Sequence, residues 1–324
     1  MLKANEKVHH IASTTFTLNK KYSDLKPIGK GSYGVVCKAN NNETKTQVAI
    51  KKITPMSKTI EDAKHVLREV RLMRHLGKHE NIVTLVNLIV RDVSDELYII
   101  MELLDSDLHR VLQSTQVLSE NHYRYFMFQL LNGVAYMQCD ALFHLLLTLY
   151  IIHRDLKPGN LLISKDCQLR ITDFGLARER PTGLGSNIEE DISTPMTEHV
   201  VTRWYRAPEL MLCPDGYYDY SVDMWSTGCI LAEMLGRKPL FPGKNFVHQL
   251  SLIFDVIGIP KQNEIIHIKN SQAKKFLSSQ KNKTKIEYNF LYPNASNESH
   301  EILENLLKFH PNTRYNCDQA LNST

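Results

Sequence analysis

The strongest constraint on the fold lies in residues 151–175. Two carboxylates, Asp155 and Asp173, stand here with Lys157 and Asn160 between two runs rich in leucine and isoleucine. Carboxylate and amide oxygens are ligands that Mg²⁺ accepts in proteins, and a lysine ammonium supplies a point charge for phosphate. One carboxylate then remains for use as a base. The stretch therefore predicts a site for a divalent cation and a polyphosphate.

The composition is that of an ordinary globular protein. The chain has 324 residues, of which 43% are hydrophobic and 23% charged, so it can bury the cores of two lobes or domains. The net charge is only +4, and 35 acidic residues are interspersed among the basic ones. We therefore expect no nucleic-acid partner. Apolar runs are too short to span a membrane, and the first residues carry no signal peptide, so no membrane partner is expected either.

Six cysteines are scattered along the chain without a Cys-x-x-Cys pair. This pattern indicates neither a zinc site nor a disulfide framework. Free thiols are typical of a reducing compartment, so the expected location is cytoplasmic, with the nucleus as a second location.

Residues 29–34 form a glycine-rich turn, Gly-Lys-Gly-Ser-Tyr-Gly. The pattern Gly-x-Gly-x-x-Gly alone is weak, because the dinucleotide-binding Rossmann turn has the same spacing. A Rossmann turn opens a helix, whereas Val35 and Val36 are β-branched and predict a second strand. We therefore expect a hairpin whose glycines let the backbone close over phosphates. A plain hairpin without a ligand is the alternative.

Two further segments follow this turn in an informative order. Val48-Ala49-Ile50-Lys51 is a short apolar strand that ends in a lysine, a suitable point charge for phosphates. Residues 61–76 have apolar side chains at helical spacing, at positions 63, 66, 67, 70 and 73, and Glu69 lies beside this stripe. A second helix is expected from Ser119, its cap, to Met137.

These segments together resemble the eukaryotic protein kinases. The catalytic and metal-binding loops of that family are similar to His153-Arg154-Asp155-Leu-Lys157-Pro-x-Asn160 and Asp173-Phe-Gly. The resemblance implies an α+β, two-lobed protein kinase fold, with a small antiparallel sheet and one helix before a mainly helical lobe. The implied parts are a polar lead-in (1–21), an N-lobe (22–104) and a C-lobe (105–324) that includes the activation segment (173–209).

The resemblance also implies the roles of individual residues in transfer from ATP with Mg²⁺. Asp155 would orient the substrate hydroxyl, Lys157 would steady the γ-phosphate, and Lys51 would pair with Glu69. Asn160 and Asp173 would hold Mg²⁺. The ATP-binding set would be Ile28, Gly29, Gly31, Gly34, Val36, Ala49, Lys51, Met101, Glu102, Leu104 and Leu162. Asp107 reads either as a ribose contact or as a helix cap.

Several segments resemble the mitogen-activated protein kinases in particular. The motif that closes the activation segment has that subfamily's form here, Thr202-Arg203-Trp204-Tyr205-Arg206-Ala-Pro-Glu209. An insert typical of the subfamily spans about residues 243–294. The subfamily implies Ser/Thr-Pro sites in protein substrates, and we expect a monomer. Asp223 would hold the catalytic loop and Arg314 would pair with Glu209.

The activation motif departs from the subfamily pattern. A Thr-x-Tyr pair is usual, but this chain has Thr197-Glu198-His199. We expect activation through phosphorylation of Thr197 alone, by an upstream kinase or by the enzyme itself. The phosphate would be bound by Arg68, Arg154 and Arg178.

Two other departures leave alternatives open. Residues 140–150 insert about nine residues before the catalytic loop, compared with the family pattern. They read as an extension of the helix, an extra loop or a mispredicted exon boundary. The chain also stops in the last helix of the fold, where the subfamily usually continues with a docking extension. A pseudokinase scaffold, a cyclin-dependent-like kinase and a glycine-loop dehydrogenase are the competing interpretations.

Overall fold

The computed structural model describes residues 5–11, 14–31, 34–56, 59–139, 149–181, 202–212, 219–262, 264–265, 268–280 and 283–323. The chain divides into two units. The first comprises Met1–Asp105 with Thr172–Gly175, and the second comprises Ser106–Ile171 with Leu176–Thr324. The short segment that begins with Thr172 and Asp173 therefore belongs to the first unit, although its neighbours in sequence belong to the second.

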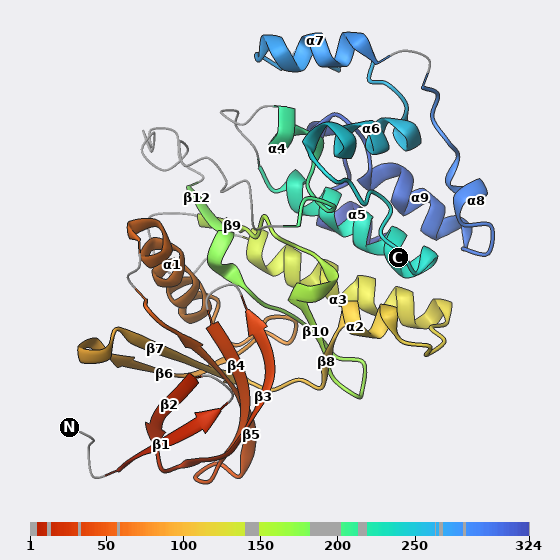
Figure 1. Ribbon diagram of the computed structural model, residues 1–324. Coiled ribbons are helices and arrows are strands. Elements are labelled where there is room, and N and C mark those ends of the chain that lie inside the picture. Colours follow the sequence, from red (N-terminus) through yellow and green to blue (C-terminus); the bar gives the residue numbers. More distant parts are fainter. Residues whose placement is uncertain are drawn as a thin grey trace. The chain divides into compact units, whose positions relative to one another are not determined.

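The first unit is built on an antiparallel five-stranded sheet with the strand order β3-β4-β5-β7-β6 (Figure 1). Its strands are β3 (Tyr22–Gly31), β4 (Gly34–Asn41), β5 (Thr46–Ile53), β6 (Leu85–Arg91) and β7 (Glu96–Glu102), and the short helix η1 (Asp92–Ser94) joins the last two. Strands β3 and β4 meet at Gly31 and Gly34, so the glycine turn lies between two strands. A Rossmann turn, which would open a helix, is thereby excluded.

The family resemblance implied one helix beside this sheet, and helix α1 (Ile60–Leu76) is that helix. The helix predicted over residues 61–76 is therefore confirmed. Thr59 caps it by accepting a hydrogen bond from the Asp62 N–H at 3.0 Å. Val66, Glu69 and Met73 are buried, but Leu67 is 69% exposed. The predicted apolar stripe was therefore wrong at Leu67, which lies one residue, about 100°, around the helix from Val66.

Residues 1–21 were expected to be a polar lead-in, and this prediction was wrong. Strands β1 (Glu6–Ile11) and β2 (Thr14–Asn19) form an antiparallel hairpin. Ile11, Phe16 and Leu18 are buried in one core cluster with residues of the sheet. The signal was the alternation Phe16-Thr-Leu18, in which every second side chain faces inward. Polar residues on the other face concealed it.

The second unit is mainly helical (Figure 1). Helix α3 (Glu120–Gln138) confirms the helix predicted after Ser119. Helix α5 (Ser221–Gly236) is its core, because every residue from Ser221 to Met234 is buried. The other helices are α2 (Leu108–Gln113), α4 (Pro208–Leu212), α6 (Phe246–Ile257), α7 (Ser271–Ser279), α8 (Tyr288–Leu291), α9 (Asn297–Leu306) and α10 (Cys317–Leu321).

Short strands frame the loops of this unit. β8 (Ser106–Asp107), β10 (Leu161–Ile163) and β11 (Leu169–Ile171) form one small sheet, while β9 (Leu149–Ile152) pairs with β12 (Arg178–Pro181). Single helical turns complete the pattern at η2 (Pro158–Asn160), η3 (Phe174–Leu176) and η4 (Pro311–Thr313). The antiparallel pairing of β9 with β12 brings together the two ends of the segment from His153 to Ala177, which includes β10 and β11.

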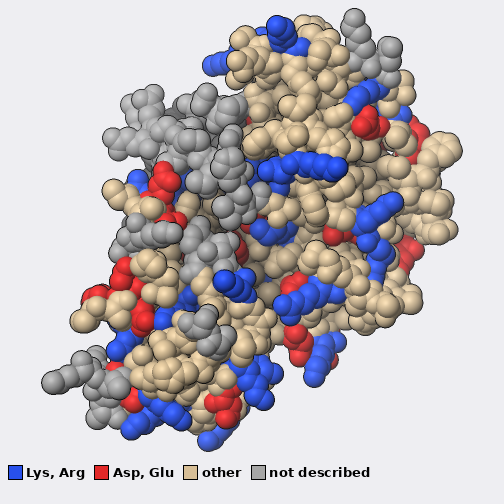
Figure 2. All heavy atoms as spheres, in the orientation of Figure 1, with Lys and Arg blue, Asp and Glu red and all other residues tan. Residues whose placement is uncertain are grey.

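Some sequence predictions fall outside the described residues. Most of the insertion, residues 140–148, lies there, and so does the activation motif with Thr197. Within the part of the chain that is described, no helix combines the length and apolarity needed to cross a bilayer. On the face drawn in Figure 2, blue and red side chains are interspersed around the strands labelled β3 to β5 in Figure 1.

Candidate active site

Lys51 and Glu69 form an ion pair inside the first unit. Lys51 points from β5, and its Nζ donates to both carboxylate oxygens of Glu69 on α1, at 2.7 and 2.9 Å. The side chains are only 12% and 4% exposed. Strand β5 supplies Lys51 from a run of buried apolar residues, and α1 supplies Glu69 from its buried face. The contact predicted from the two sequence segments is therefore present.

Asp173 lies close enough to this pair to influence its charge. Burial raises the pKa of Glu69 above its ordinary value, and the charge of Asp173 acts in the same direction while Lys51 opposes it. Asp173 has a left-handed backbone with φ 70°, which is uncommon for a residue with a side chain. Next to it, Arg68 Nη1 donates to the Gly175 carbonyl at 3.3 Å. Two carboxylates, the Lys51 ammonium and the Arg68 guanidinium thus lie in this part of the unit.

Gly34, the last glycine of the motif, lies against the backbone of β5. A Cβ placed on Gly34 would stand 1.7 Å from the Lys52 carbonyl oxygen, so only a glycine fits. From the sequence, the glycines were expected to let the backbone of the turn close over phosphates. At Gly34 the structure adds a second reason, which is close packing of the turn on the strand that carries Lys51.

The residues predicted to surround the adenine lie on several strands. In the first unit, Ala49 and Met101 are buried opposite each other in the pairing of β5 with β7, and Val36 is partly buried on β4. The Glu102 N–H already donates to the Thr84 carbonyl at 3.1 Å, and its side chain accepts from the Thr84 N–H at 2.6 Å. Of the Glu102 backbone groups, its carbonyl is the one that a nucleotide would have to use.

The remaining nucleotide residues divide between the two units. Ile28, Gly29 and Gly31 lie on β3 and Leu104 follows β7, all in the first unit, while Leu162 lies on β10 in the second. Asp107 is the cap of α2 and accepts from the Arg110 N–H at 2.9 Å. The helix-cap interpretation of Asp107 is therefore confirmed.

In the second unit, Asp155 is the centre of a polar cluster. Its Oδ2 accepts hydrogen bonds from Lys157 Nζ at 2.7 Å and from Asn160 Nδ2 at 3.1 Å. Asn160 Nδ2 also donates to the Asp155 carbonyl at 2.8 Å. Asp155 is 9% exposed and Asn160 6% exposed. The cluster holds a carboxylate in one orientation with a cation beside it, as a base that orients a hydroxyl requires.

Helix α5 fixes the backbone of this loop. The two carboxylate oxygens of Asp223 accept from the N–H groups of His153 and Arg154, at 2.7 and 2.8 Å. Burial raises the pKa of Asp223, while His153, Arg154 and the two N–H donors act against the shift. Arg154 has φ 68°, so the chain turns sharply just before Asp155. The predicted contact of Asp223 with the catalytic loop is confirmed.

The three arginines predicted to bind phosphate each lie beside the segment after Asp173. Arg68 contacts the Gly175 carbonyl, Arg154 Nη1 donates to the Leu176 carbonyl at 3.4 Å, and Arg178 Nη1 donates to the Ala177 carbonyl at 3.1 Å. Their proposed ligand, Thr197, is outside the described residues.

The segment 202–209 is anchored more firmly than its motif revealed. Tyr205 OH donates to Glu233 on α5 at 2.5 Å, and Ser226 Oγ donates to the Tyr205 carbonyl at 2.8 Å. Trp204 Nε1 donates to the Gly243 carbonyl at 3.1 Å. Glu233 and Ser226 were missed from the sequence, because a polar residue in an apolar helix shows no partner until the fold is known.

Arg206 and Glu209 complete this segment. Burial lowers the pKa of Arg206, and the nearby Asp155 charge opposes that shift. The Glu209 carboxylate accepts from Arg314 Nη1 and Nη2 at 2.6 and 2.7 Å, so the predicted pair is confirmed. Arg314 also stacks on Trp225, 5.0 Å from the ring centre.

Each unit carries an oxygen ligand suited to a hard cation. Asp173 offers a carboxylate in the first unit, and in the second the Asn160 amide nitrogen is turned toward Asp155, which leaves the amide oxygen as the ligand atom. This donor chemistry fits Mg²⁺. Within the described ranges, no three His, Cys, Asp or Glu side chains are grouped as a metal site of their own.

Comparison with known proteins identifies relatives along almost the whole chain. Residues 22–324 match the family described as the protein kinase domain. Mitogen-activated protein kinase 7 of Arabidopsis thaliana is 44% identical over 311 residues, 95% of this chain and 79% of that protein. Mitogen-activated protein kinase 2 of the same plant is 42% identical over 98% of this chain and 80% of its own length. Extracellular signal-regulated kinase 1 of Dictyostelium discoideum is 41% identical over 97% of this chain and 56% of its own.

Proposed function

The chain belongs to the protein kinase family and, within it, to the mitogen-activated protein kinases, and on this premise we propose which of its residues carry the reaction. It is a Ser/Thr protein kinase of the mitogen-activated type that acts in signal transduction, with ATP and proteins as substrates. The polar group of the first unit binds ATP, and the polar group of the second unit acts on the substrate hydroxyl. The observation that carries this proposal is the buried pair of Lys51 with Glu69 beside Asp173.

In the first unit, Lys51 binds the α- and β-phosphates of ATP. Glu69 holds the ammonium in place through its two hydrogen bonds, so the lysine meets the nucleotide already oriented. The backbone of the glycine turn covers the phosphates, and the Glu102 carbonyl and Leu104 N–H bond the adenine edge. Asp173 and Asn160 would hold Mg²⁺, which would supply positive charge against the phosphates.

In the second unit, Asp155 accepts the proton of the substrate hydroxyl as that oxygen bonds to the γ-phosphorus of ATP. The bond from this phosphorus to the β–γ bridging oxygen breaks at the same time, so that ADP leaves. Lys157 lies 2.7 Å from the same carboxylate and steadies the charge that develops on the transferred group. Asn160 fixes the orientation of Asp155 from the other side. The anchored segment 202–209 presents the substrate protein, with a preference for Ser-Pro and Thr-Pro sites.

Regulation acts through a single phosphothreonine in this proposal. Phosphate on Thr197 adds about two negative charges, and Arg68, Arg154 and Arg178 bind it. The phosphate is added by an upstream kinase or by the enzyme itself, and the protein acts as a monomer in the cytoplasm, with the nucleus as a second location. The motif supports this proposal because His199 replaces the tyrosine of the usual pair.

A transfer assay tests the catalytic proposal. Purified protein, with and without phosphate on Thr197, is incubated with radiolabelled ATP, Mg²⁺ and a library of Ser-Pro, Thr-Pro and matched Ser-Ala peptides. Asp155→Asn should lower the rate by about 10²–10⁴-fold, because the base is lost while the shape remains. ATP binding without any transfer would instead support a scaffold without turnover. Full activity of Thr197→Ala would contradict the regulatory part.

A further inference from the structure

Two successive lysines on β5 serve opposite faces of the sheet. Neighbouring side chains of a strand alternate between faces, so Lys51 and Lys52 point away from each other. Lys51 pairs with Glu69 of α1, whereas Lys52 Nζ donates to Glu96 Oε1 on β7 at 2.7 Å. The Lys52 side chain is only 3% exposed. Burial of a lysine is costly, so its place in the fold calls for a reason.

Lys52 binds the β1–β2 hairpin as well as the sheet. Its Nζ donates to the Thr15 carbonyl of β2 at 2.5 Å. The ammonium also lies 5.8 Å from the centre of the Phe16 ring and 5.7 Å from that of Tyr98, within the range of cation–π attraction. From β5, the Lys52 side chain therefore contacts both β2 and β7.

Tyr98 repeats this connection one step along β2. Its hydroxyl donates to Glu96 Oε2 at 2.9 Å and accepts from the Thr17 N–H at 3.0 Å. The Thr15 carbonyl and the Thr17 N–H are thus both bonded to side chains that share the Glu96 carboxylate. The hairpin is held at a fixed register, since each bond involves a particular backbone group of β2.

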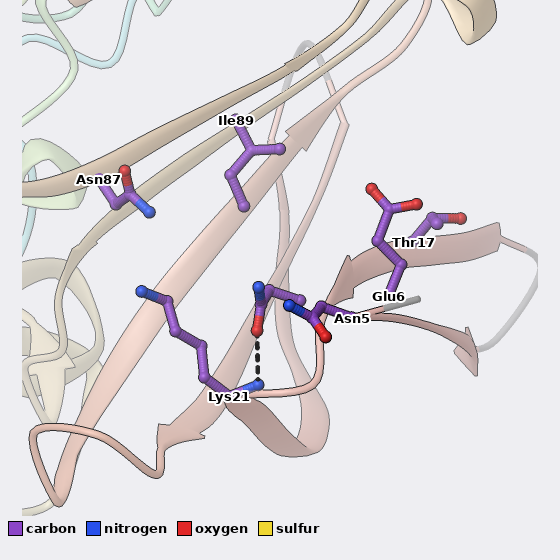
Figure 3. A pocket seen from close by; sticks show the side chains of 7 residues that line it. Asn5, Glu6, Thr17, Lys21, Asn87 and Ile89 are labelled. Atoms are coloured by element: carbon purple, nitrogen blue, oxygen red, sulfur yellow. Dashed lines mark hydrogen bonds between the residues drawn. The ribbon is translucent and has the colours of Figure 1, made fainter. Parts of the chain in front are cut away.

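Elsewhere the hairpin and the sheet are not in continuous contact. A hollow of about 380 Å³ is lined by Glu6, Thr17, Lys21, Asn87 and others between the hairpin and β6 (Figure 3). Beyond its edge, Arg91 Nη1 donates to Glu6 Oε1 at 2.5 Å. The position of the hairpin therefore depends on the polar contacts of Lys52, Tyr98 and Arg91 and on the apolar cluster around Phe16.

The backbone of Lys52 also supports the glycine turn. As described above, Gly34 approaches the Lys52 carbonyl so closely that a Cβ would not fit. A shift of the Lys52 backbone would move Gly34, and it would also move Lys51, the residue that precedes Lys52 in the strand. The polar network on the hairpin face is thus connected through one residue to both nucleotide-binding elements of the unit.

We propose that Lys52 is a positioning residue, which ties β5 to the β1–β2 hairpin and thereby sets the positions of Lys51 and the glycine turn on the nucleotide. A well-packed apolar pair would stabilise the fold at least as well as a buried ion pair. The ion pair adds directional bonds to Thr15 and Glu96, which fix position. This inference rests on the proposed role of Lys51 in ATP binding.

A double-mutant cycle on nucleotide binding tests the proposal. The first change replaces the ion pair by Lys52→Met with Glu96→Met, which leaves no orphaned charge and keeps the volume. The second change is Lys51→Met. Affinity for ATP with Mg²⁺ is measured by calorimetry in the unchanged protein, in each variant and in the combination. Circular dichroism confirms folding, and Tyr98→Phe, which removes only one hydroxyl, replaces the first change if folding fails.

We expect the first change to weaken ATP binding about three- to tenfold when Lys51 is present, and less than twofold when Lys51 is methionine. Equal weakening in both backgrounds would mean a merely structural role and would overturn the inference. So would unchanged affinity in every protein except the Lys51 variants. If the unchanged protein does not bind ATP with Mg²⁺, the proposed function fails and this inference with it.

Discussion

The two faces of strand β5 use the same pair of residue types for different ends. On one face Lys51 pairs with Glu69, and on the other Lys52 pairs with Glu96, each with its shortest contact at 2.7 Å. The pKa values of the two carboxylates, Glu69 and Glu96, shift in opposite directions. Burial raises the pKa of Glu69, whereas the pKa of Glu96 is lowered, because hydrogen bonds from Lys52 and Tyr98 outweigh the effect of its burial.

The surroundings explain this difference. Near Glu69 the charge of a second carboxylate, Asp173, adds to the effect of burial in raising the Glu69 pKa, and Lys51 opposes both. Near Glu96 the Tyr98 hydroxyl adds a donor, and Arg91 Nε lies 3.8 Å away, so the carboxylate is fully compensated. The charges around each ion pair thus distinguish the Lys51–Glu69 pair of the candidate active site from the Lys52–Glu96 pair, which stabilises the fold.

Removing Lys52 should have the largest effect on stability. Lys52→Met strands the Glu96 carboxylate and the Thr15 carbonyl beneath the hairpin, and we expect a loss of about 3–5 kcal/mol in the free energy of unfolding. Urea denaturation measures it. The matched control is Lys21→Met, which breaks the exposed pair with Glu43 and should cost less than about 1 kcal/mol. Equal losses would remove the contrast.

Removing Lys51 should affect catalysis instead. Lys51→Met should lower the rate of phosphoryl transfer by about 10²–10³-fold, because a charge aimed at the phosphates is lost. Its cost in unfolding free energy should be smaller than that of Lys52→Met, since Glu69 with its raised pKa can take up a proton. Both quantities come from the same protein preparation. A loss of unfolding free energy as large as that of Lys52→Met would show that Lys51 stabilises the fold as much as Lys52 does, and would contradict the contrast between the two faces of β5.

A smaller effect is expected for Glu69→Gln. The amide keeps one acceptor for Lys51 but removes a buried charge next to Asp173. Misplacement of Lys51 should lower transfer by about tenfold to a hundredfold. The melting temperature should stay near that of the unchanged protein. An unaltered rate would contradict the positioning role of Glu69.

The smallest expected effect is in the dependence of the unfolding free energy on pH. Glu96 and Glu69 should change this free energy in opposite directions as the pH falls. The pKa of Glu96 is lowered on folding, so its stabilisation is present above the unfolded value and is lost as pH falls through the folded one. The advantage of the unchanged protein over Glu96→Gln should therefore shrink toward acid.

Glu69 should show the reverse. Its pKa is raised on folding, so the cost of its buried charge is relieved as pH falls through the folded value toward the unfolded one. Relative to Glu69→Gln, the unchanged protein should gain stability over that window. Urea denaturation at a series of pH values checks both, and slopes of the same sign would contradict the assignment.

The sequence predicted those parts of the fold in which local pattern and chemistry agree. Lys51, Glu69 and Asp223 were placed correctly because a charged residue in an apolar element demands a partner, and the family pattern supplied it. Helix α1 followed from the helical spacing of its apolar side chains. The Glu209–Arg314 pair needed the family pattern, since its members lie 105 residues apart in sequence.

Other parts could not be predicted from the sequence because the deciding partner is distant. Lys52 looks like any polar residue on an alternating strand, and only the hairpin residue Thr15 shows why it is buried. The hairpin itself was missed because its polar face dominates its composition. The Glu233 carboxylate, likewise, is explained only by Tyr205.

The contact of Asp223 with the catalytic loop has a consequence for heat inactivation. The carboxylate that holds His153 and Arg154 belongs to a helix with no exposed residue between Ser221 and Met234. Such a helix does not fray alone, so the loop cannot lose its shape while its lobe stays folded. Warming should then distort the catalytic loop only at the temperature at which the helical lobe melts, with no cooler step in which that lobe stays folded around a loop that has lost its shape.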